Sequence, residues 1–179
     1  MGAVPTIAVP FDEHRAVVRP EWIDQNRHMN MGYYLVVFDT ATDAFLAWLG
    51  LDAAHRREQR VTTFALEAHV TYHREVCAGD PLRFTSRLLD YDAKRIHYFH
   101  EMWQEREHYL AATNELMSLQ VSEVTRRSAP MAPGVLDRLA QVRAAHAALS
   151  RPPQVGRRIG LSERPSCPRP RAGDPADPP

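Results

Sequence analysis

The sequence WIDQNRHMNMGYYLVVFDTATDAFLAWLG, residues 22–50, decides the fold and contains the densest group of polar residues suited to chemistry. In its second half, apolar side chains recur at steps of three and four residues, the spacing of one helical face. They are Tyr34, Phe38, Ala41, Phe45 and Trp48. Asn30 suits the N-cap of such a helix and Gly50 suits its C-terminal stop, so a long buried helix is predicted between them.

The polar half of the same stretch, residues 24–30, leads directly into the N-terminus of that helix. It places a carboxylate (Asp24), a carboxamide (Asn26) and an imidazole (His28) beside backbone N–H groups that have no partner inside the helix. Those groups carry a partial positive charge and can polarise a carbonyl oxygen, so the pattern favours a catalytic loop. The alternative is an ordinary polar turn, in which Asp24 and Asn26 accept hydrogen bonds from the backbone.

The chain after residue 60 follows the two-residue alternation of β-strands. Strands are predicted from residue 61 toward residue 75 if no bulge intervenes, and at 82–89, 95–103 and 109–122. A short edge strand is predicted at 14–20, before the loop. One long helix followed by antiparallel strands at hairpin spacing is an α+β arrangement, which we expect to form a curved sheet wrapped around the helix.

Composition favours one soluble globular domain and excludes several classes of function. The 179 residues are 44% hydrophobic and 25% charged, and a formal net charge of zero removes the basic footprint of nucleic-acid binding. No apolar run is long enough for a membrane span, and the N-terminus lacks a secretory signal, so a cytoplasmic protein without a membrane partner is expected. The nine histidines and two cysteines form no metal-ligand pattern, and no G-x-S-x-G motif occurs, so neither a metal nor another cofactor is expected.

The C-terminal region is predicted to have two parts after a folded domain of residues 1–133. Residues 134–149 are rich in alanine and carry leucine and valine at helical spacing, which predicts a short amphipathic helix. Residues 150–179 contain eight of the fourteen prolines and no aromatic residue. Such a segment buries too little apolar surface to offset its ordering entropy, so a disordered Pro/Arg-rich tail is expected.

The string Asp24-x-Asn26-x-His28-x-Asn30-x-x-x-Tyr34 before a long aromatic helix resembles the hotdog-fold acyl thioesterases of the 4-hydroxybenzoyl-CoA thioesterase-like superfamily. Many of these relatives carry Gly where this chain has Arg27. The likeness continues through residues 67–70, 72–76, 79–82, 88–95 and 111–115. In that extended form the chain is most similar to the betainyl-CoA thioesterases associated with carnitine dehydrogenase. The resemblance covers residues 14–133 and implies a hotdog fold, one long helix wrapped by a curved antiparallel sheet.

The resemblance implies roles for four polar residues. Asp24 would be the principal carboxylate, as nucleophile or as general base, and Asn26 would orient it or the attacking water. His28 would position the acyl carbonyl or transfer a proton. Glu75 matches a second carboxylate of the plant acyl-ACP enzymes, although it could equally be a surface glutamate paired with Arg74. Backbone N–H groups of residues 31–33 would form the oxyanion hole.

A betainyl substrate would require a site for a quaternary ammonium, which aromatic faces and a nearby carboxylate hold best. The aromatic candidates are Trp22, Tyr33, Tyr34, Tyr72 and Trp103, and Glu67 could supply the negative charge. Further candidates for the substrate pocket are Asn30, Met31, His69 and Asn114. The alternatives are that the aromatic residues belong to the core, that Glu67 and His69 lie on a solvated face, and that Asn114 is a satisfied buried amide.

The predicted activity is hydrolysis of a short acyl-CoA thioester, betainyl-CoA, to glycine betaine and CoA in carnitine degradation. The resemblance also implies a homodimer, or a homotetramer of two dimers, with sites at the interface. A thioesterase for a medium-chain or aromatic acyl-CoA is one alternative. A non-catalytic acyl-CoA-binding hotdog module is the other, although pure binding would not require Asp24 and Glu75.

Overall fold

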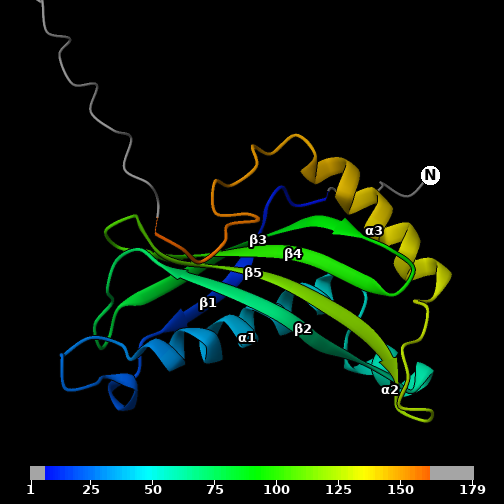
Figure 1. The fold of residues 1–179 in the computed structure, drawn as a ribbon, viewed down its shortest axis with the longest axis horizontal. Helices are drawn as coiled ribbons and strands as arrows, with labels where there is room; N and C mark the ends of the chain where they lie inside the picture. Colours follow the sequence, from blue (N-terminus) through cyan, green and yellow to red (C-terminus); the bar gives the residue numbers. More distant parts are fainter. Residues whose placement is uncertain (1–6, 162–179) are drawn as a thin grey trace, which may run out of the picture.

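The computed structural model describes residues 7–161 (Figure 1). The elements in chain order are β1 (Phe11–Val17), η1 (Pro20–Trp22), α1 (Met31–Trp48), α2 (Ala53–Gln59), β2 (Val61–Tyr72), β3 (Pro81–Tyr91), β4 (Arg95–Gln104), β5 (Tyr109–Ser122) and α3 (Pro133–His146). The five strands form one antiparallel sheet in the order β1-β3-β4-β5-β2, which curves around α1 in Figure 1. The predicted α+β arrangement is confirmed.

Helix α1 begins and ends where its sequence predicted. The side chain of Asn30 accepts a hydrogen bond from the Gly32 amide at 3.0 Å, and Gly50 follows the helix with a φ of 93°, a backbone conformation that suits glycine. Its apolar stripe is buried against the sheet. Within residues 7–161 no single helix is long and apolar enough to span a membrane. Helices α1 and α2 meet the criterion of length and composition only as a pair, which is bent by 68°.

The core beneath α1 contains a fully buried imidazole, that of His100 on β4. It is bonded on both sides, with Nδ1 2.7 Å from Ser86 Oγ and Nε2 3.0 Å from Thr42 Oγ1. Phe38 stacks on the ring at a centroid distance of 6.2 Å. Burial lowers the pKa of His100 to about 3, so the ring is neutral at ordinary pH and links α1 to the sheet without placing a charge in the core.

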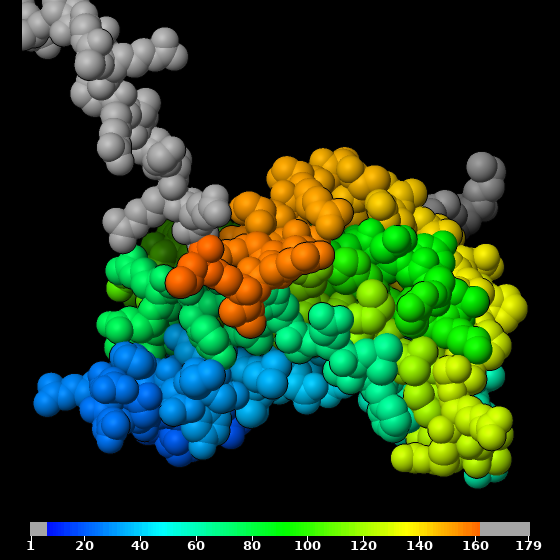
Figure 2. All heavy atoms as spheres, in the orientation of Figure 1, coloured from blue at the N-terminus to red at the C-terminus, as the bar shows by residue number. Residues whose placement is uncertain are grey.

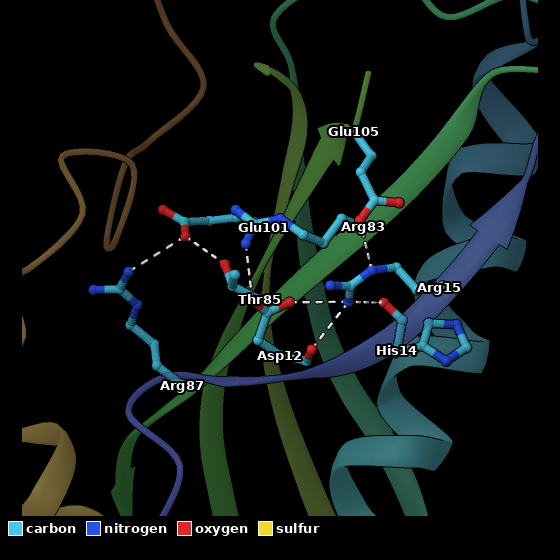
Figure 3. A network of polar contacts seen from close by, with 8 residues as sticks. All are labelled: Asp12, His14, Arg15, Arg83, Thr85, Arg87, Glu101 and Glu105. Carbon is cyan, nitrogen blue, oxygen red and sulfur yellow. Dashed lines mark hydrogen bonds and ion pairs between the residues drawn. The ribbon is translucent and has the colours of Figure 1, made fainter. Parts of the chain in front are cut away.

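The outer face of the sheet, turned away from α1, is polar (Figure 3). Arg15 bonds both Asp12 and Glu105 at 2.9 Å, and Arg83 bonds the second oxygen of Asp12 at 2.8 Å. Farther along the same face, Glu101 accepts hydrogen bonds from the Thr85 hydroxyl at 2.6 Å and from the guanidinium of Arg87 at 3.4 Å. On β1 and β3 the side chains turned away from α1 are therefore mainly polar, whereas β4 also carries the apolar Phe99 and Trp103 on this face.

The C-terminal region packs on the sheet more extensively than predicted. Helix α3 packs against β3, and His146 on α3 stacks against Trp48 of α1 at 6.1 Å. Residues 150–161, orange in Figure 2, then lie across the outer face of the sheet. Their backbone is fixed by two hydrogen bonds, from Arg87 to the Ser150 carbonyl and from the Gly156 amide to Glu115, each at 2.7 Å.

This placement differs from the predicted disorder of residues 150–179. The prediction counted the apolar surface of the segment itself, whereas polar side chains on the neighbouring strands supply partners for its backbone, and Pro152 is buried. Residues 162–179 lie outside the described part of the chain. Helix α3 is also shorter than the predicted 134–149, since it ends at His146.

Candidate active site

The polar loop before α1 folds back on itself as a small closed turn. Ile23 and Met29 form an isolated antiparallel bridge, and the Asp24 amide donates to the His28 carbonyl at 3.1 Å. The Met29 amide donates to the carbonyl of Val76 at 2.9 Å, which ties the loop to the segment that follows β2. Asp24 and His28 therefore face each other across the base of the turn.

Asp24 combines the two roles that the sequence left open. Its Oδ1 accepts a hydrogen bond from the Asn26 backbone amide at 2.7 Å, which is the bond expected of an ordinary polar turn. Its Oδ2 forms no hydrogen bond within residues 7–161 and remains free to act on another molecule. The side chain of Asn26 is exposed beside it.

Arg27 adopts a φ of 68°, in the left-handed region that non-glycine residues seldom occupy. This conformation gives a physical reason for the glycine that many similar thioesterases carry at this position, because glycine has no Cβ to clash there. The departure at Arg27 therefore changes the side chain without changing the path of the loop.

The opposite wall is formed where β2 ends at Tyr72. The amides of His73 and Arg74 both donate to the carbonyl of Ala111, at 2.9 and 3.1 Å, which turns the chain out of the ladder. The hydroxyl of Tyr109 donates to the carbonyl of Glu75 at 2.8 Å and fixes its position. Glu75 Oε2 then lies 4.0 Å from His28 Nε2, so the second predicted carboxylate approaches the imidazole of the loop.

A cavity of about 420 Å³ lies between these two walls and the N-terminus of α1. Its lining residues are Asp24, His28, Met29, Asn30, Met31, Tyr34, Tyr72, His73, Arg74 and Glu75. Seven of them were predicted from sequence, and the structure brings them together. Met29, His73 and Arg74 were not among the predicted site residues. Met29 lies in the loop, and β2 ends at Tyr72, so the three consecutive residues that follow it, His73, Arg74 and Glu75, all line the cavity.

Two tyrosines form the apolar side of this cavity. Tyr34 on α1 meets Tyr72 on β2 edge to face, with centroids 5.1 Å apart, and the Tyr72 hydroxyl donates to the Met31 carbonyl at 3.1 Å. Burial is the main cause that raises the pKa of Tyr34, to about 12, and it raises the pKa of Tyr72 as well. Both phenols are therefore neutral, and their rings give the cavity an electron-rich wall.

The N-terminus of α1 offers fewer free donors than predicted for residues 31–33. The Gly32 amide is bonded to the Asn30 side chain, and the Tyr33 amide donates to the Asn30 carbonyl, both at 3.0 Å. The amide of Met31 has no hydrogen-bond partner within the described residues. It is therefore the backbone group best able to donate to an oxyanion in the cavity.

The remaining predicted residues lie outside this cavity. Trp22 stacks on Tyr33 at 5.8 Å beside the loop, and Trp103 lies on the outer face of β4, where Arg83 sits 5.9 Å from its ring. Glu67 and His69 line a separate hollow of about 350 Å³ on the outer face. Asn114 is buried on the inner face of β5. The structure therefore does not assemble the aromatic candidates and Glu67 into one cage.

No metal site accompanies this cavity in the part of the chain that the structure describes, where no three His, Cys, Asp or Glu side chains are placed to share an ion. The arrangement instead offers a free carboxylate oxygen, an imidazole with a carboxylate partner and a helix N-terminus. Together these groups can activate water or attack an acyl carbon, and can stabilise the negative charge that develops on its oxygen.

Comparison with known families and proteins gives consistent matches. Residues 18–139 match the model of the thioesterase-like superfamily. The chain is 40% identical over 144 residues to the betainyl-CoA thioesterase of Pseudomonas aeruginosa, which covers 80% of this chain and 91% of that protein. It is 37% identical over 127 residues to the L-carnitine dehydrogenase/betainyl-CoA thioesterase of Agrobacterium fabrum. That match covers 71% of this chain but only 26% of the longer protein.

Solved structures agree with this family. A Staphylococcus aureus protein determined in complex with CoA has a TM-score of 0.80 and 31% identity, over 89% of this chain and 100% of that one. A thioesterase-like protein of Pseudomonas putida KT2440, described as a putative thioesterase, has a TM-score of 0.74 and 30% identity, over 86% and 98%. The predicted hotdog fold and the predicted thioesterase family are confirmed.

Proposed function

Because the chain belongs to the thioesterase-like superfamily, we propose that it hydrolyses an acyl-CoA thioester and that its substrate is betainyl-CoA, which yields glycine betaine and CoA. The observation that carries this proposal is the cavity that gathers Asp24, His28 and Glu75 at the N-terminus of α1. The two relatives are named as betainyl-CoA thioesterases, which supports betainyl as the acyl group. The Staphylococcus aureus protein was determined in complex with CoA, which supports CoA as the thiol part of the substrate.

In the proposed reaction, the thioester carbonyl oxygen accepts a hydrogen bond from the Met31 amide at the positive end of the helix. Asp24 then takes a proton from a water molecule whose oxygen attacks the carbonyl carbon. Alternatively, Asp24 attacks that carbon itself and water hydrolyses the resulting anhydride. In either sequence the C–S bond breaks, the acyl group leaves as a carboxylic acid, and the departing CoA sulfur takes up a proton.

Asn26, His28 and Glu75 assist Asp24 in this scheme. Asn26 holds Asp24 through the turn bond of its amide and presents its side chain to the attacking water. His28 lies within reach of both the cavity and Glu75, so it can deliver a proton to the leaving sulfur. Glu75 can orient the imidazole for this transfer, since the two side chains are 4.0 Å apart.

We further propose that the active form is a cytoplasmic homodimer in which a second copy closes the cavity. Within residues 7–161, strand β2 pairs only with β5, so its other edge is open in this part of the chain. Exposed apolar side chains follow this edge and the adjacent face of α1: Met31, Leu35, Val36, Phe64, Leu66 and Tyr72. Met31 and Tyr72 also line the cavity, so a partner covering this surface would contribute to the site.

A steady-state assay of thiol release with four substrates tests the proposed activity. Betainyl-CoA is compared with acetyl-, octanoyl- and benzoyl-CoA under identical conditions, and kcat/KM is measured for each. The proposal predicts the highest value for betainyl-CoA. Faster cleavage of a neutral acyl-CoA would retain the thioesterase and reject the betainyl substrate. Absence of cleavage by folded protein, with CoA still bound, would identify a binding module instead.

A further inference from the structure

Asn114 on β5 is the least satisfied polar side chain in the described core. It is 0% exposed, and neither its Oδ1 nor its Nδ2 has a hydrogen-bond partner. Gln120 on the same strand is also buried, yet its Nε2 donates to the Pro130 carbonyl at 2.8 Å. Because a buried amide without partners is strongly disfavoured, the retention of Asn114 requires an explanation beyond packing.

The position of Asn114 along β5 places its side chain on the inner face of the sheet. Leu116 and Ser118, two and four residues farther on, both face α1, since Leu116 is part of the core and Ser118 bonds Tyr98 at 2.8 Å. Asn114 has the same parity. It lies opposite Val70 on β2 and His100 on β4, and His100 in turn contacts Phe38 and Thr42 in the middle of α1.

This position is next to the tyrosine wall of the candidate site along the sheet. Tyr72 is paired with Ala112, so Asn114 is its diagonal neighbour on the same face, at a Cα separation of about 7–8 Å. Val70 and Ala112 pack in one cluster with Tyr34, which meets Tyr72 edge to face. Asn114 therefore lies one residue pair farther along the inner face than Tyr72, next to the cluster that backs the cavity.

The surroundings of Asn114 contain no formal charge. No Lys, Arg, Asp or Glu is among the buried residues of the described chain, and the neighbouring His100 is neutral and has both nitrogens bonded to hydroxyl groups. The carbonyl dipole of Asn114 is thus the strongest unpaired polar group on this part of the inner face. A carbonyl oxygen among aromatic and small apolar side chains suits a methylated cation, which has no N–H to donate.

We propose that Asn114 determines specificity for the acyl group by facing the quaternary ammonium of the bound substrate. The inference rests on the proposed function and adds the residue that contacts the cationic end of the acyl group. Tyr72 lies on the open edge strand and is 45% exposed, so its ring can move aside as the acyl group enters behind it. The ammonium methyl groups then contact the ring faces of Tyr34 and Tyr72 and the oxygen of Asn114.

The test compares two substrates of the same shape and different charge. Betainyl-CoA carries a trimethylammonium group, and tert-butylacetyl-CoA replaces its nitrogen by carbon. Asn114→Leu keeps the size of the side chain and removes both polar atoms. We expect this variant to lower kcat/KM for betainyl-CoA by about tenfold or more, while tert-butylacetyl-CoA is cleaved as well as by wild type or better. Its Tm should rise, because an unpaired buried amide is removed.

Two further variants make the result decisive. Asn114→Ala also removes both polar atoms but leaves a smaller side chain. It must change the ratio of kcat/KM for betainyl-CoA to kcat/KM for tert-butylacetyl-CoA in the same direction as Asn114→Leu. Gln120→Leu removes a buried amide from the same face of β5 away from the cavity, so it should lower the Tm and leave the ratio unchanged. A ratio that stays at the wild-type value in both Asn114 variants would show that Asn114 is structural and overturn the inference.

The outcome also separates this inference from the proposed function. If wild type prefers betainyl-CoA and the Asn114 variants keep that preference, the function stands and the role of Asn114 is rejected. If wild type cleaves tert-butylacetyl-CoA or another neutral thioester but not betainyl-CoA, both the substrate and the role of Asn114 are rejected, although the thioesterase remains.

Discussion

At the scale of single residues, the site depends on backbone conformations that were invisible in the sequence. The string of polar residues from Asp24 to Asn30 indicated which side chains to examine. Which oxygen of Asp24 is free, and which amide of the helix N-terminus has no partner, follow from the closed turn and from the cap by Asn30. These details identify Oδ2 of Asp24 as the available carboxylate oxygen and the Met31 amide as the available hydrogen-bond donor.

Arg27 gives a prediction at this scale. Because its φ of 68° disfavours side chains with a Cβ, Arg27→Gly should keep full activity and raise the free energy of unfolding by about 1 kcal/mol. Arg27→Val should destabilise the loop, since a β-branched residue fits this conformation worst. Urea denaturation and the thiol-release assay measure both effects. Equal stability of the Gly and Val variants would contradict this account.

The buried imidazole of His100 gives a prediction about pH. Its pKa in the folded protein is about 3, below the ordinary value of 6.5, so the unfolded chain binds a proton that the folded protein does not. The stability due to the neutral ring is complete above pH 6.5 and is lost as the pH falls toward 3, by about 1.4 kcal/mol per pH unit. His146 acts in the same direction, since burial also lowers its pKa.

Urea denaturation of wild type and His100→Asn at several pH values between about 7 and 5 tests this linkage. The variant should be less stable near neutral pH, because Ser86 and Thr42 lose their partner, but its stability should depend less steeply on pH. Parallel curves for the two proteins would contradict the assignment of the slope to His100.

At the scale of elements, strand β2 shows what sequence patterns could and could not predict. Its alternation predicted the strand and its approximate ends. A register shift between Ala65 and Glu67 then reverses which residues face α1, and the strand stops at Tyr72. Bulges leave no clear mark in a single sequence, so the position of this shift could not be foreseen. The shift precedes Glu67, so Glu67 and His69 still alternate with Tyr72 and lie on the opposite face of the strand, which was one of the two alternatives open from the sequence. Helix α1, with caps and a strong period, was fully predictable.

The open edge of β2 gives a prediction about assembly. Leu66 is 55% exposed on this edge, so Leu66→Lys should shift the protein from dimer to monomer and lower kcat/KM, because a buried charge disfavours the interface. The matched control is Ile159→Lys on the outer face, where Ile159 is 94% exposed. Light scattering after gel filtration measures the mass. A wild type that is already monomeric and active would rule out the proposed dimer.

At the scale of the whole molecule, one sheet wrapped around one helix places the helix N-terminus, the polar loop and the end of β2 at a single opening. Sequence predicted this architecture because the helix and the strands have clear periods and the loop resembles a known family. It did not predict the path of residues 150–161, whose position depends on partners such as Arg87 and Glu115 from distant strands.

The measurement that tests the central claim most directly is kcat/KM for betainyl-CoA with wild type and Asp24→Asn. The variant keeps the acceptor of the turn bond and removes the negative charge, so the loop should remain folded and CoA should still bind. The account predicts active wild type and a loss of about a thousandfold or more in the variant, mainly in kcat. Wild-type kcat/KM in a folded Asp24→Asn protein would contradict the placement of catalysis at this carboxylate.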